Sequence, residues 1–163
     1  MTFTPRPYQQ DAHDAIINSW RRSLAPCLVE AATGAGKSII VAMVAKTLNK
    51  ISNNKRVLCL APSKELTEQN AEKYASLGEP FSFYSASIQK SLRHRVVFAT
   101  PGTFVKVASV VGGQFGGVII DEAHNTTPTI KKIVADMQAG NPNLRVCGLT
   151  ATPYRLNDGY IYA

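Results

Sequence analysis

The sequence contains no run of apolar residues long enough to cross a membrane, and its first residues lack the apolar core of a secretory signal. It also has no internal repeat, low-complexity tract or long linker. The 163 residues, of which 45% are hydrophobic, are enough for one domain with a buried core. We therefore expect a single globular domain that is cytoplasmic and has no membrane partner.

Cysteine is also scarce. Cys27, Cys59 and Cys147 each lie inside an apolar run, and their spacing does not match a metal site. An odd number of such thiols predicts reduced packing residues in a cytosolic protein, rather than disulfides or metal ligands.

Acidic residues are in the minority, since 11 Asp and Glu stand against 18 Lys and Arg, for a net charge of +7. A basic surface concentrates polyanions, so nucleic acid is the natural partner, although many basic domains are charged only for solubility. The basic group Lys90, Arg93, His94 and Arg95 has two interpretations: it extends a nucleic-acid track, or it is a solvated loop before a strand. The second is favoured, because charge runs usually form solvated faces.

Short apolar runs alternate with amphipathic patterns along the whole chain. The patterns predict strands at 27–31, 56–61, 81–84, 95–99, in the run that ends at 121, and at 145–150, and helices at 7–22, 37–50, 64–77, shortly after 101, and at 128–139. This alternation predicts an α/β fold of three layers, with a mainly parallel central sheet between helices. Sheets of this kind bind ligands at the carboxyl ends of their strands.

The stretch AATGAGKS, residues 31–38, lies between the first predicted strand and a helix. Its glycines let the backbone wrap a phosphate, and several N–H groups converge there at the start of the helix. We expect Lys37 to reach the β- and γ-phosphates of a nucleoside triphosphate, and the Ser38 hydroxyl to bind Mg²⁺. The predicted nucleotide-binding residues of this phosphate loop are Thr33, Gly34, Ala35, Gly36, Lys37 and Ser38.

Two carboxylates, Asp121 and Glu122, follow a strand of apolar residues directly. A buried charge is costly unless it is compensated, and Mg²⁺ with its waters would compensate Asp121. Glu122 would then orient and deprotonate the attacking water. A helix cap after a core strand is the alternative explanation, and it would be preferred if the chain had no phosphate loop. The two motifs together predict a site of ATP hydrolysis.

These motifs resemble those of a known family, the superfamily 2 helicases. AATGAGKS at 31–38, DEAH at 121–124 and TAT at 150–152 resemble its motifs I, II and III, and the alanine at position 31 is common in that superfamily. RPYQ at 6–9 resembles the adenine-reading Q motif.

Two further stretches complete the resemblance, because APSKEL at 61–66 is similar to motif Ia and ATPG at 99–102 to motif Ib. The six motifs follow the family's order and cover nearly the whole chain. Within the superfamily, the residues at 6–10 and 143–162 look most like the RadD-type DNA-repair ATPases.

The resemblance implies a RecA-like P-loop NTPase domain that uses ATP and Mg²⁺, with Lys37 and Glu122 as catalytic residues. It implies that Gln9 hydrogen-bonds the adenine edge, with Arg6 or an upstream aromatic such as Phe3 packed on the ring. Without the resemblance, Gln9 would be taken as a plain residue at a helix start. The resemblance also implies that Thr150 and Thr152 couple nucleotide state to domain movement, with His124 as their contact partner. The residues implied to contact nucleic-acid phosphates are Ser63, Lys64, Thr100 and Gly102.

The implied function is that of the ATP-binding motor domain of a DNA-dependent ATPase or helicase acting in DNA repair or recombination. Motors of this superfamily have a second RecA-like domain that supplies arginines for the transferring phosphate, and such an arginine is worth a factor of about 10³ to 10⁵ in rate. The 163 residues match one domain, so we expect a fragment or half-motor that is weakly active without its partner domain.

Two other functions stay open. The motifs are also close to those of the motor portion of a type I or type III restriction enzyme. A nonenzymatic module that binds nucleotide or nucleic acid would share them too. DNA is expected over RNA from the resemblance, although contacts to the phosphate backbone do not distinguish the sugar.

Overall fold

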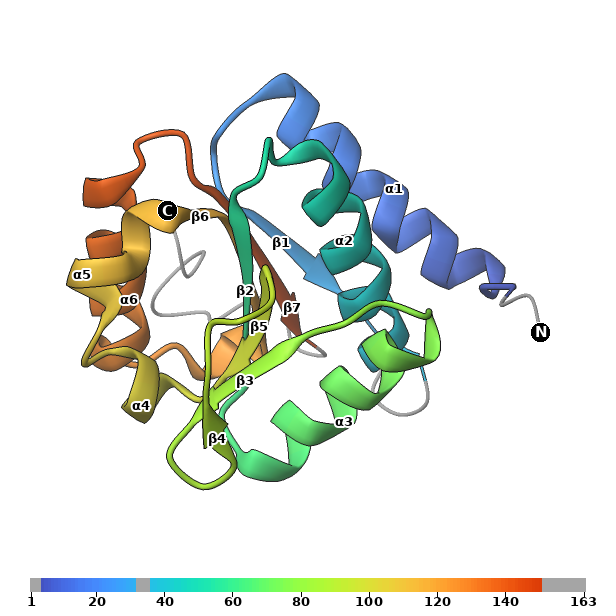
Figure 1. The fold of residues 1–163 in the computed structure, drawn as a ribbon. Helices are drawn as coiled ribbons and strands as arrows, with labels where there is room; N and C mark the ends of the chain where they lie inside the picture. The colour runs from blue at the N-terminus through green and yellow to red at the C-terminus, as the bar shows by residue number, and fades with distance from the viewer. Residues whose placement is uncertain (1–3, 32–35, 151–163) are drawn as a thin grey trace.

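The computed structural model describes residues 4–31 and 36–150, and within them the predicted α/β fold is confirmed. Strands and helices alternate along the chain (Figure 1). The strands are β1 Cys27–Glu30, β2 Arg56–Leu60, β3 Ser82–Ser85, β4 Gln89–Lys90, β5 Val96–Ala99, β6 Phe115–Asp121 and β7 Arg145–Thr150. The α-helices are α1 Pro7–Arg22, α2 Lys37–Ile51, α3 Lys64–Ser76, α4 Pro101–Phe104, α5 Ala108–Val111 and α6 Pro128–Gly140, and 3₁₀ turns cover Gly112–Gln114 and Ala123–Asn125.

The strands form one sheet in the order β1-β7-β6-β2-β5-β3-β4. Within the described residues all neighbouring strands are parallel, except that β4 pairs antiparallel with β3. The two-residue strand β4 and the helix α5 were missed by the sequence analysis, because segments this short do not show a recognisable period. The other predicted segments agree with the structure to within one or two residues at each end.

Both faces of the sheet are covered by helices, which confirms the three layers (Figure 1). Successive strand residues point to opposite faces, so each central strand contributes to two cores. Val57 and Cys59 of β2 pack in the cluster with helices α1, α2 and α3, whereas Leu58 and Leu60 pack in the cluster with α4, α5 and α6. This burial on both sides explains why the strands read as continuous apolar runs.

The helix α1 packs beside α2 on one face, and it is anchored to the sheet by Trp20. Its indole N–H donates a hydrogen bond to the Val146 carbonyl at 3.3 Å. No helix in the described part of the chain is long and apolar enough to cross a membrane.

Candidate functional site

The predicted site residues that the structure describes gather at the carboxyl edge of the sheet. The phosphate loop follows β1, Thr150 ends β7, and Asp121 ends β6. These three strands are direct neighbours in the sheet, with Glu30 in register with Thr150 and Asp121 with Leu149. The sheet therefore brings together three segments that lie far apart in the sequence. Thr33, Gly34, Ala35 and Thr152 lie outside the described residues.

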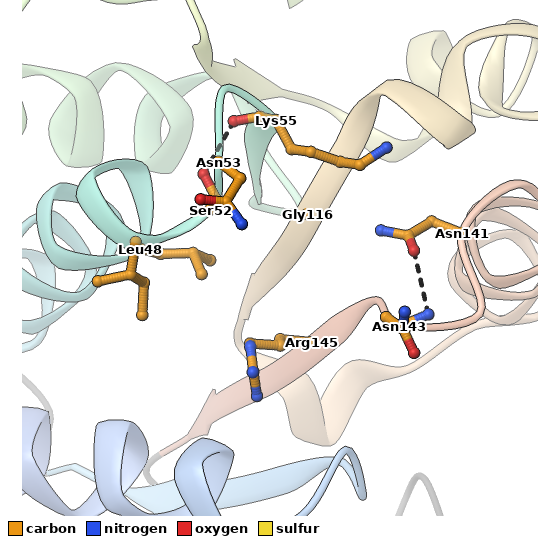
Figure 2. A pocket seen from close by; sticks show the side chains of 9 residues that line it. Leu48, Ser52, Asn53, Lys55, Gly116, Asn141, Asn143 and Arg145 are labelled. Carbon is orange, nitrogen blue, oxygen red and sulfur yellow. Dashed lines mark hydrogen bonds between the residues drawn. The ribbon is translucent and has the colours of Figure 1, made fainter.

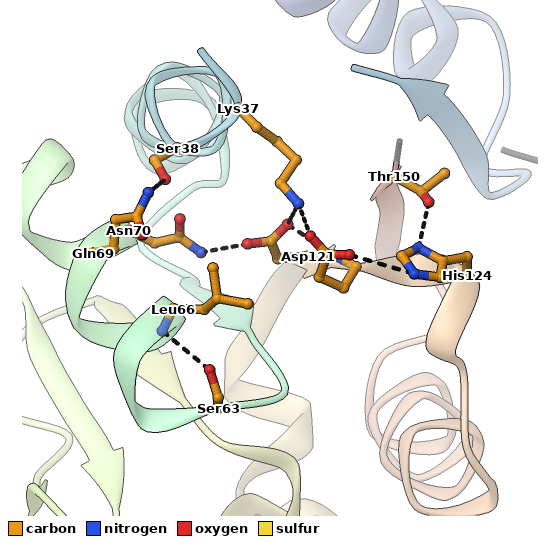
Figure 3. A network of polar contacts seen from close by, with 10 residues as sticks. Lys37, Ser38, Ser63, Leu66, Gln69, Asn70, Asp121, His124 and Thr150 are labelled. Atoms are coloured by element: carbon orange, nitrogen blue, oxygen red, sulfur yellow. Dashed lines mark hydrogen bonds and ion pairs between the residues drawn. The ribbon is translucent and has the colours of Figure 1, made fainter. Parts of the chain in front are cut away.

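Lys37, the first residue of α2, is the centre of the polar contacts at this edge (Figure 3). Its Nζ lies 2.9 Å from Asp121 Oδ1 and also donates a hydrogen bond to Glu122 Oε1. Burial lowers the pKa of Lys37, but the hydrogen bonds and charges of Glu122 and Asp121 outweigh that effect and raise it above its usual value. The ammonium group therefore stays charged although the residue is 7% exposed.

Glu122 occupies a strained position directly after β6. Its backbone has φ 55° and ψ 46°, the left-handed region that residues other than glycine rarely adopt. Such outliers persist where the surrounding structure holds them, and they concentrate at functional sites. Here the left-handed conformation turns the chain at the end of β6. The turn is held by a hydrogen bond from the Glu122 N–H to Asp121 Oδ1 at 2.9 Å.

His124 links the acidic pair to β7, as the resemblance implied. Its Nδ1 lies 2.6 Å from Thr150 Oγ1, and its Nε2 lies 3.4 Å from Glu122 Oε2. Residues from the phosphate loop, the DEAH segment and the last strand therefore form one connected polar network. The contact between His124 and Thr150 was expected from the sequence, and its role in coupling stays a prediction.

Gln9 contacts both the start of helix α1 and the residue that precedes α2, Gly36. Its Oε1 accepts the Arg6 N–H at 2.8 Å, which satisfies the start of α1, and its Nε2 donates to the Gly36 carbonyl at 3.4 Å. The residue is 4% exposed, whereas Arg6 is exposed. Tyr8 lies so close to Gly36 that any side chain at position 36 would collide with its ring. The start of α1 therefore lies against the end of the phosphate loop.

The residues expected to touch nucleic acid follow β2 and β5, farther along the same edge. Ser63 is the N-cap of α3, and its Oγ accepts the Leu66 N–H at 3.2 Å, while Lys64 is exposed. Thr100 Oγ1 donates to Ser85 Oγ at 3.1 Å, and Gly102 has open space around its Cα. Capping uses only the acceptor side of the Ser63 hydroxyl, so its O–H proton is available to another group.

The basic group at 90–95 is divided between the two edges of the sheet. Lys90 is in register with Tyr84, which is in register with Ala99 near the carboxyl edge. The chain then runs back along β3 to the amino edge, where the His94 N–H donates to Ser82 Oγ at 2.8 Å and Arg95 Nη1 donates to Asn54 Oδ1 at 2.9 Å. This placement supports the solvated loop for His94 and Arg95, and leaves Lys90 on the functional edge.

Two site residues were missed by the sequence analysis, Gln69 and Asn70 of α3. Gln69 Nε2 donates to Ser38 Oγ at 3.1 Å, and Asn70 Nδ2 donates to Asp121 Oδ2 at 3.0 Å (Figure 3). Asn70 shares the buried face of α3 with Thr67, Ala71 and Tyr74. An amide at a core position of an amphipathic helix was the available signal, because buried polar groups need partners.

A polar cavity of about 230 Å³ lies at the opposite, amino edge of the sheet (Figure 2). Its polar side chains already bond to the backbone: Lys55 Nζ donates to the Gly113 carbonyl at 2.9 Å, and Asn141 Nδ2 donates to the Phe115 carbonyl at 2.9 Å. Arg145 Nη1 likewise donates to the Trp20 carbonyl. These bonds fasten loops to strand ends, so the cavity is part of the scaffold.

The carboxyl edge has the donor set that Mg²⁺ and a triphosphate require. Ser38 and Asp121 supply one hydroxyl and one carboxylate, and Mg²⁺ usually takes one or two such protein ligands together with phosphates and water. Within the described residues, no three or more His, Cys, Asp and Glu side chains are arranged so that they could hold a metal ion by themselves. The residues present fit a metal that arrives with its nucleotide.

A family model described as "Type III restriction enzyme, res subunit" matches residues 2–155. The chain belongs to this family. Its fold is the RecA-like domain of superfamily 2 helicases, as two solved structures also indicate. The UvsW helicase from bacteriophage T4 is 25% identical with a TM-score of 0.77, and the match covers 97% of this chain and 55% of UvsW. The Hef helicase domain from Pyrococcus furiosus is 26% identical with a TM-score of 0.73, over 93% of this chain and 34% of Hef.

A curated relative is also a helicase by name. The "ATP-dependent DNA helicase mph1" of Sclerotinia sclerotiorum is 28% identical over 141 residues, which are 77% of this chain and 11% of that protein. The chain thus spans about a tenth of this relative and about half of UvsW. The family and these relatives identify the chain as a helicase-type motor domain.

Proposed function

We propose that this domain binds and hydrolyses Mg²⁺–ATP as the first motor domain of a DNA-dependent ATPase in DNA repair or recombination. The observation that carries the proposal is the contact of Lys37 Nζ with both Asp121 and Glu122. A lysine at the start of a helix after a glycine-rich loop, facing two carboxylates at a strand end, is the arrangement that phosphoryl transfer from a nucleotide needs.

The side chains divide the work by their chemistry. Lys37, held charged by its partners, neutralises oxygens of the β- and γ-phosphates. Ser38 and Asp121 would hold Mg²⁺, which when bound stabilises negative charge on the transferring phosphoryl group. Glu122 orients the attacking water and takes its proton, and His124 holds the carboxylate of Glu122 from the side of Thr150.

Gln9 is proposed to read the adenine base. A side-chain amide has two N–H donors and two acceptor lone pairs, and Gln9 uses one of each kind for Gly36 and Arg6. The remaining donor and acceptor match the adjacent acceptor and donor on the edge of adenine, so ATP should bind better than GTP. Exposed Arg6 would then pack on the ring.

Nucleic acid is proposed to lie along the carboxyl ends of β2 and β5, on Ser63, Lys64, Thr100 and Gly102. Contacts of this kind hold the phosphate backbone and do not read its sequence. The net charge of +7 favours the same partner. DNA is proposed over RNA because the mph1 relative is named a DNA helicase.

A second RecA-like domain is proposed as the partner that completes the ATP site. The chain matches only part of each relative, 55% of UvsW and 34% of Hef. Hydrolysis by residues 1–163 alone should therefore be slow, and unwinding should require the complete motor.

The motor of a type I or type III restriction enzyme is a second candidate, and the description of the matching family names the type III enzyme. Both candidates use the same ATP site, so the site does not distinguish them. A nuclease or methylase module encoded with this domain would decide for the restriction enzyme.

Nucleotide binding by Lys37→Ala tests the proposal. Removing a charged donor to phosphate should weaken binding of a fluorescent ATP analogue in Mg²⁺ by about 10- to 100-fold, measured by anisotropy. Exposed Lys64→Ala is the matched control and should leave nucleotide affinity unchanged. Equal affinity of Lys37→Ala and the unmodified chain would contradict the proposed phosphate contact, and a Lys37→Ala variant with every measurable activity unchanged would favour a nonenzymatic module.

A further inference from the structure

The helix α3 packs beside α2, the helix that Lys37 begins, and its side chains reach the proposed nucleotide site (Figure 3). It begins at Ser63, and two turns later it presents Gln69 and Asn70, which are neighbours in the sequence. Each of these amides donates a hydrogen bond to one of the two proposed magnesium ligands, Gln69 to Ser38 Oγ and Asn70 to Asp121 Oδ2 (Figure 3). One helical segment thus contacts both ligands.

Asn70 is the more constrained of the two. It is 1% exposed, and its partner Asp121 is 2% exposed, so the hydrogen bond between them is shielded from water. The bond from Asn70 Nδ2 to Oδ2 of Asp121 opposes rotation of the carboxylate, whose Oδ1 lies 2.9 Å from Lys37 Nζ. Asn70 Oδ1 is itself buried and accepts no hydrogen bond from the described residues. An unpaired buried acceptor is costly, so its retention calls for an explanation.

Gln69 is exposed, but its amide crosses to the buried hydroxyl of Ser38. As the donor in this contact Gln69 uses one lone pair of Oγ, which leaves the other lone pair for a second group and limits the directions in which it can point. A hydroxyl can bind Mg²⁺ only through a lone pair, so the contact sets the orientation of this ligand.

We propose that Gln69 and Asn70 are positioning residues that hold Ser38 and Asp121 in the geometry Mg²⁺ requires. The inference rests on the proposed Mg²⁺–ATP site. Mg²⁺ demands near-ideal octahedral geometry, so its ligands gain from being fixed in advance. Partners behind metal ligands typically contribute 10- to 100-fold to metal affinity. The buried Asn70 Oδ1, beside Asp121, would be available to accept a hydrogen bond from a water at this site.

The test measures the Mg²⁺ dependence of nucleotide binding. A fluorescent ADP analogue is titrated against the chain in EDTA and at increasing Mg²⁺, for the variants Asn70→Leu and Gln69→Ala. Leucine keeps the branching of asparagine but removes the amide. The Mg²⁺ concentration for half-maximal enhancement of binding should rise about 10- to 100-fold in Asn70→Leu. It should rise less in Gln69→Ala, because water can replace an exposed amide, and affinity in EDTA should not change.

Glu68→Gln, an exposed change on the same helix, is the control and should leave the Mg²⁺ dependence unchanged. If Asn70→Leu unfolds, Gln69→Ala carries the test, because an exposed side chain can be truncated without loss of the core. An unchanged Mg²⁺ requirement in the folded variants would overturn the inference while the proposed function stands. A chain that binds no Mg²⁺–nucleotide at all would overturn the proposed function first.

Discussion

Glu122 stands between a lysine and a histidine with its backbone in the left-handed region. The left-handed backbone turns the chain after β6, and the contacts with Lys37 and His124 hold the carboxylate in place. A carboxylate held in this way suits a group that must orient water. Asp121 differs, because it is buried at the end of β6, in register with Leu149 of β7.

Glu122→Gln should separate catalysis from binding. The amide keeps the size of the side chain but cannot accept a proton, so ATP turnover should fall by about 10²- to 10⁴-fold. Nucleotide affinity should stay within a few-fold of the unmodified chain. Phosphate release, measured in the chain joined to its motor partner, gives the rate. Undiminished turnover would show that Glu122 is not the base.

Cys27 and Cys147 show a second feature at the scale of single residues, because they are in register on neighbouring strands. A hydrogen bond from the Cys147 thiol lowers the pKa of Cys27 below its usual range, whereas the bond to Cys27 together with burial raises that of Cys147. Burial also raises the pKa of Cys59. The three cysteines, which were expected to be reduced packing residues, thus comprise one partly exposed thiol, Cys27, and two buried thiols, Cys59 and Cys147.

Iodoacetamide should therefore alkylate Cys27 before the other two cysteines. Because the thiolate is the form that reacts, the alkylation rate at Cys27 should rise as the pH increases through its lowered pKa. This rise should occur at a lower pH than the rise for a free cysteine. Mass spectrometry of the labelled peptides measures the order. Cys147→Ala removes the donor and should shift the rise to higher pH. Equal labelling of Cys27 and Cys59 in the folded chain would contradict the assignment.

At the scale of elements, helix α3 carries two tasks. Its N-cap Ser63 belongs to the proposed nucleic-acid edge, and its second turn contacts the magnesium ligands. The sequence predicted the helix at 64–77 from its amphipathic pattern, and the structure adds that Ser63 is its N-cap. The sequence did not predict the contacts of Gln69 and Asn70, since these depend on how α3 lies against α2 and β6.

Substitutions at Ser63 should separate capping from nucleic-acid contact. Ser63→Ala should lower the free energy of unfolding by about 1 kcal/mol, and Thr127→Ala at the N-cap of α6 should do the same. Ser63→Asp keeps a good cap, so stability should hold, but its charge should repel phosphate and weaken DNA binding. Denaturant unfolding and fluorescence anisotropy with single-stranded DNA measure the two effects. Unchanged DNA affinity of Ser63→Asp would exclude Ser63 from the interface.

At the scale of the whole molecule, the strand order separates two regions along one edge. The proposed ATP site occupies β1, β7 and β6, and the proposed nucleic-acid residues follow β2 and β5. Because β6 and β2 are neighbours, the regions adjoin at the point where Asp121 meets α3. The opposite edge carries the cavity beside Lys55 and Arg145, whose cations are bonded to backbone carbonyls.

Charge reversal at Lys90 and Arg93 tests this division. Both side chains are exposed and three positions apart, but Lys90 lies near the carboxyl edge and the chain after it runs to the other edge. Lys90→Glu should weaken DNA binding more than Arg93→Glu does, although the net charge changes equally. At about 0.15 M ionic strength the screening length is about 8 Å, which is short enough to separate the two positions. Equal effects would mean that net charge alone drives binding.

The sequence by itself determined the alternation of strands and helices, the phosphate loop and the acidic strand end. These features depend on local periodicity, on glycine and proline positions and on residue types in a fixed spacing, all of which can be read without knowing the fold. It also allowed the contact of His124 with Thr150 to be expected through the resemblance to superfamily 2 helicases.

Only the tertiary structure decided which segments meet. The sheet order brings Lys37 to Glu122 across 85 positions of sequence, sets Gln69 and Asn70 against the ligand residues, and sends the basic group to two edges. Strand order and helix packing follow from burial of both sheet faces at once, a property of the whole chain. No local pattern around residue 70 or residue 90 could have revealed its neighbours.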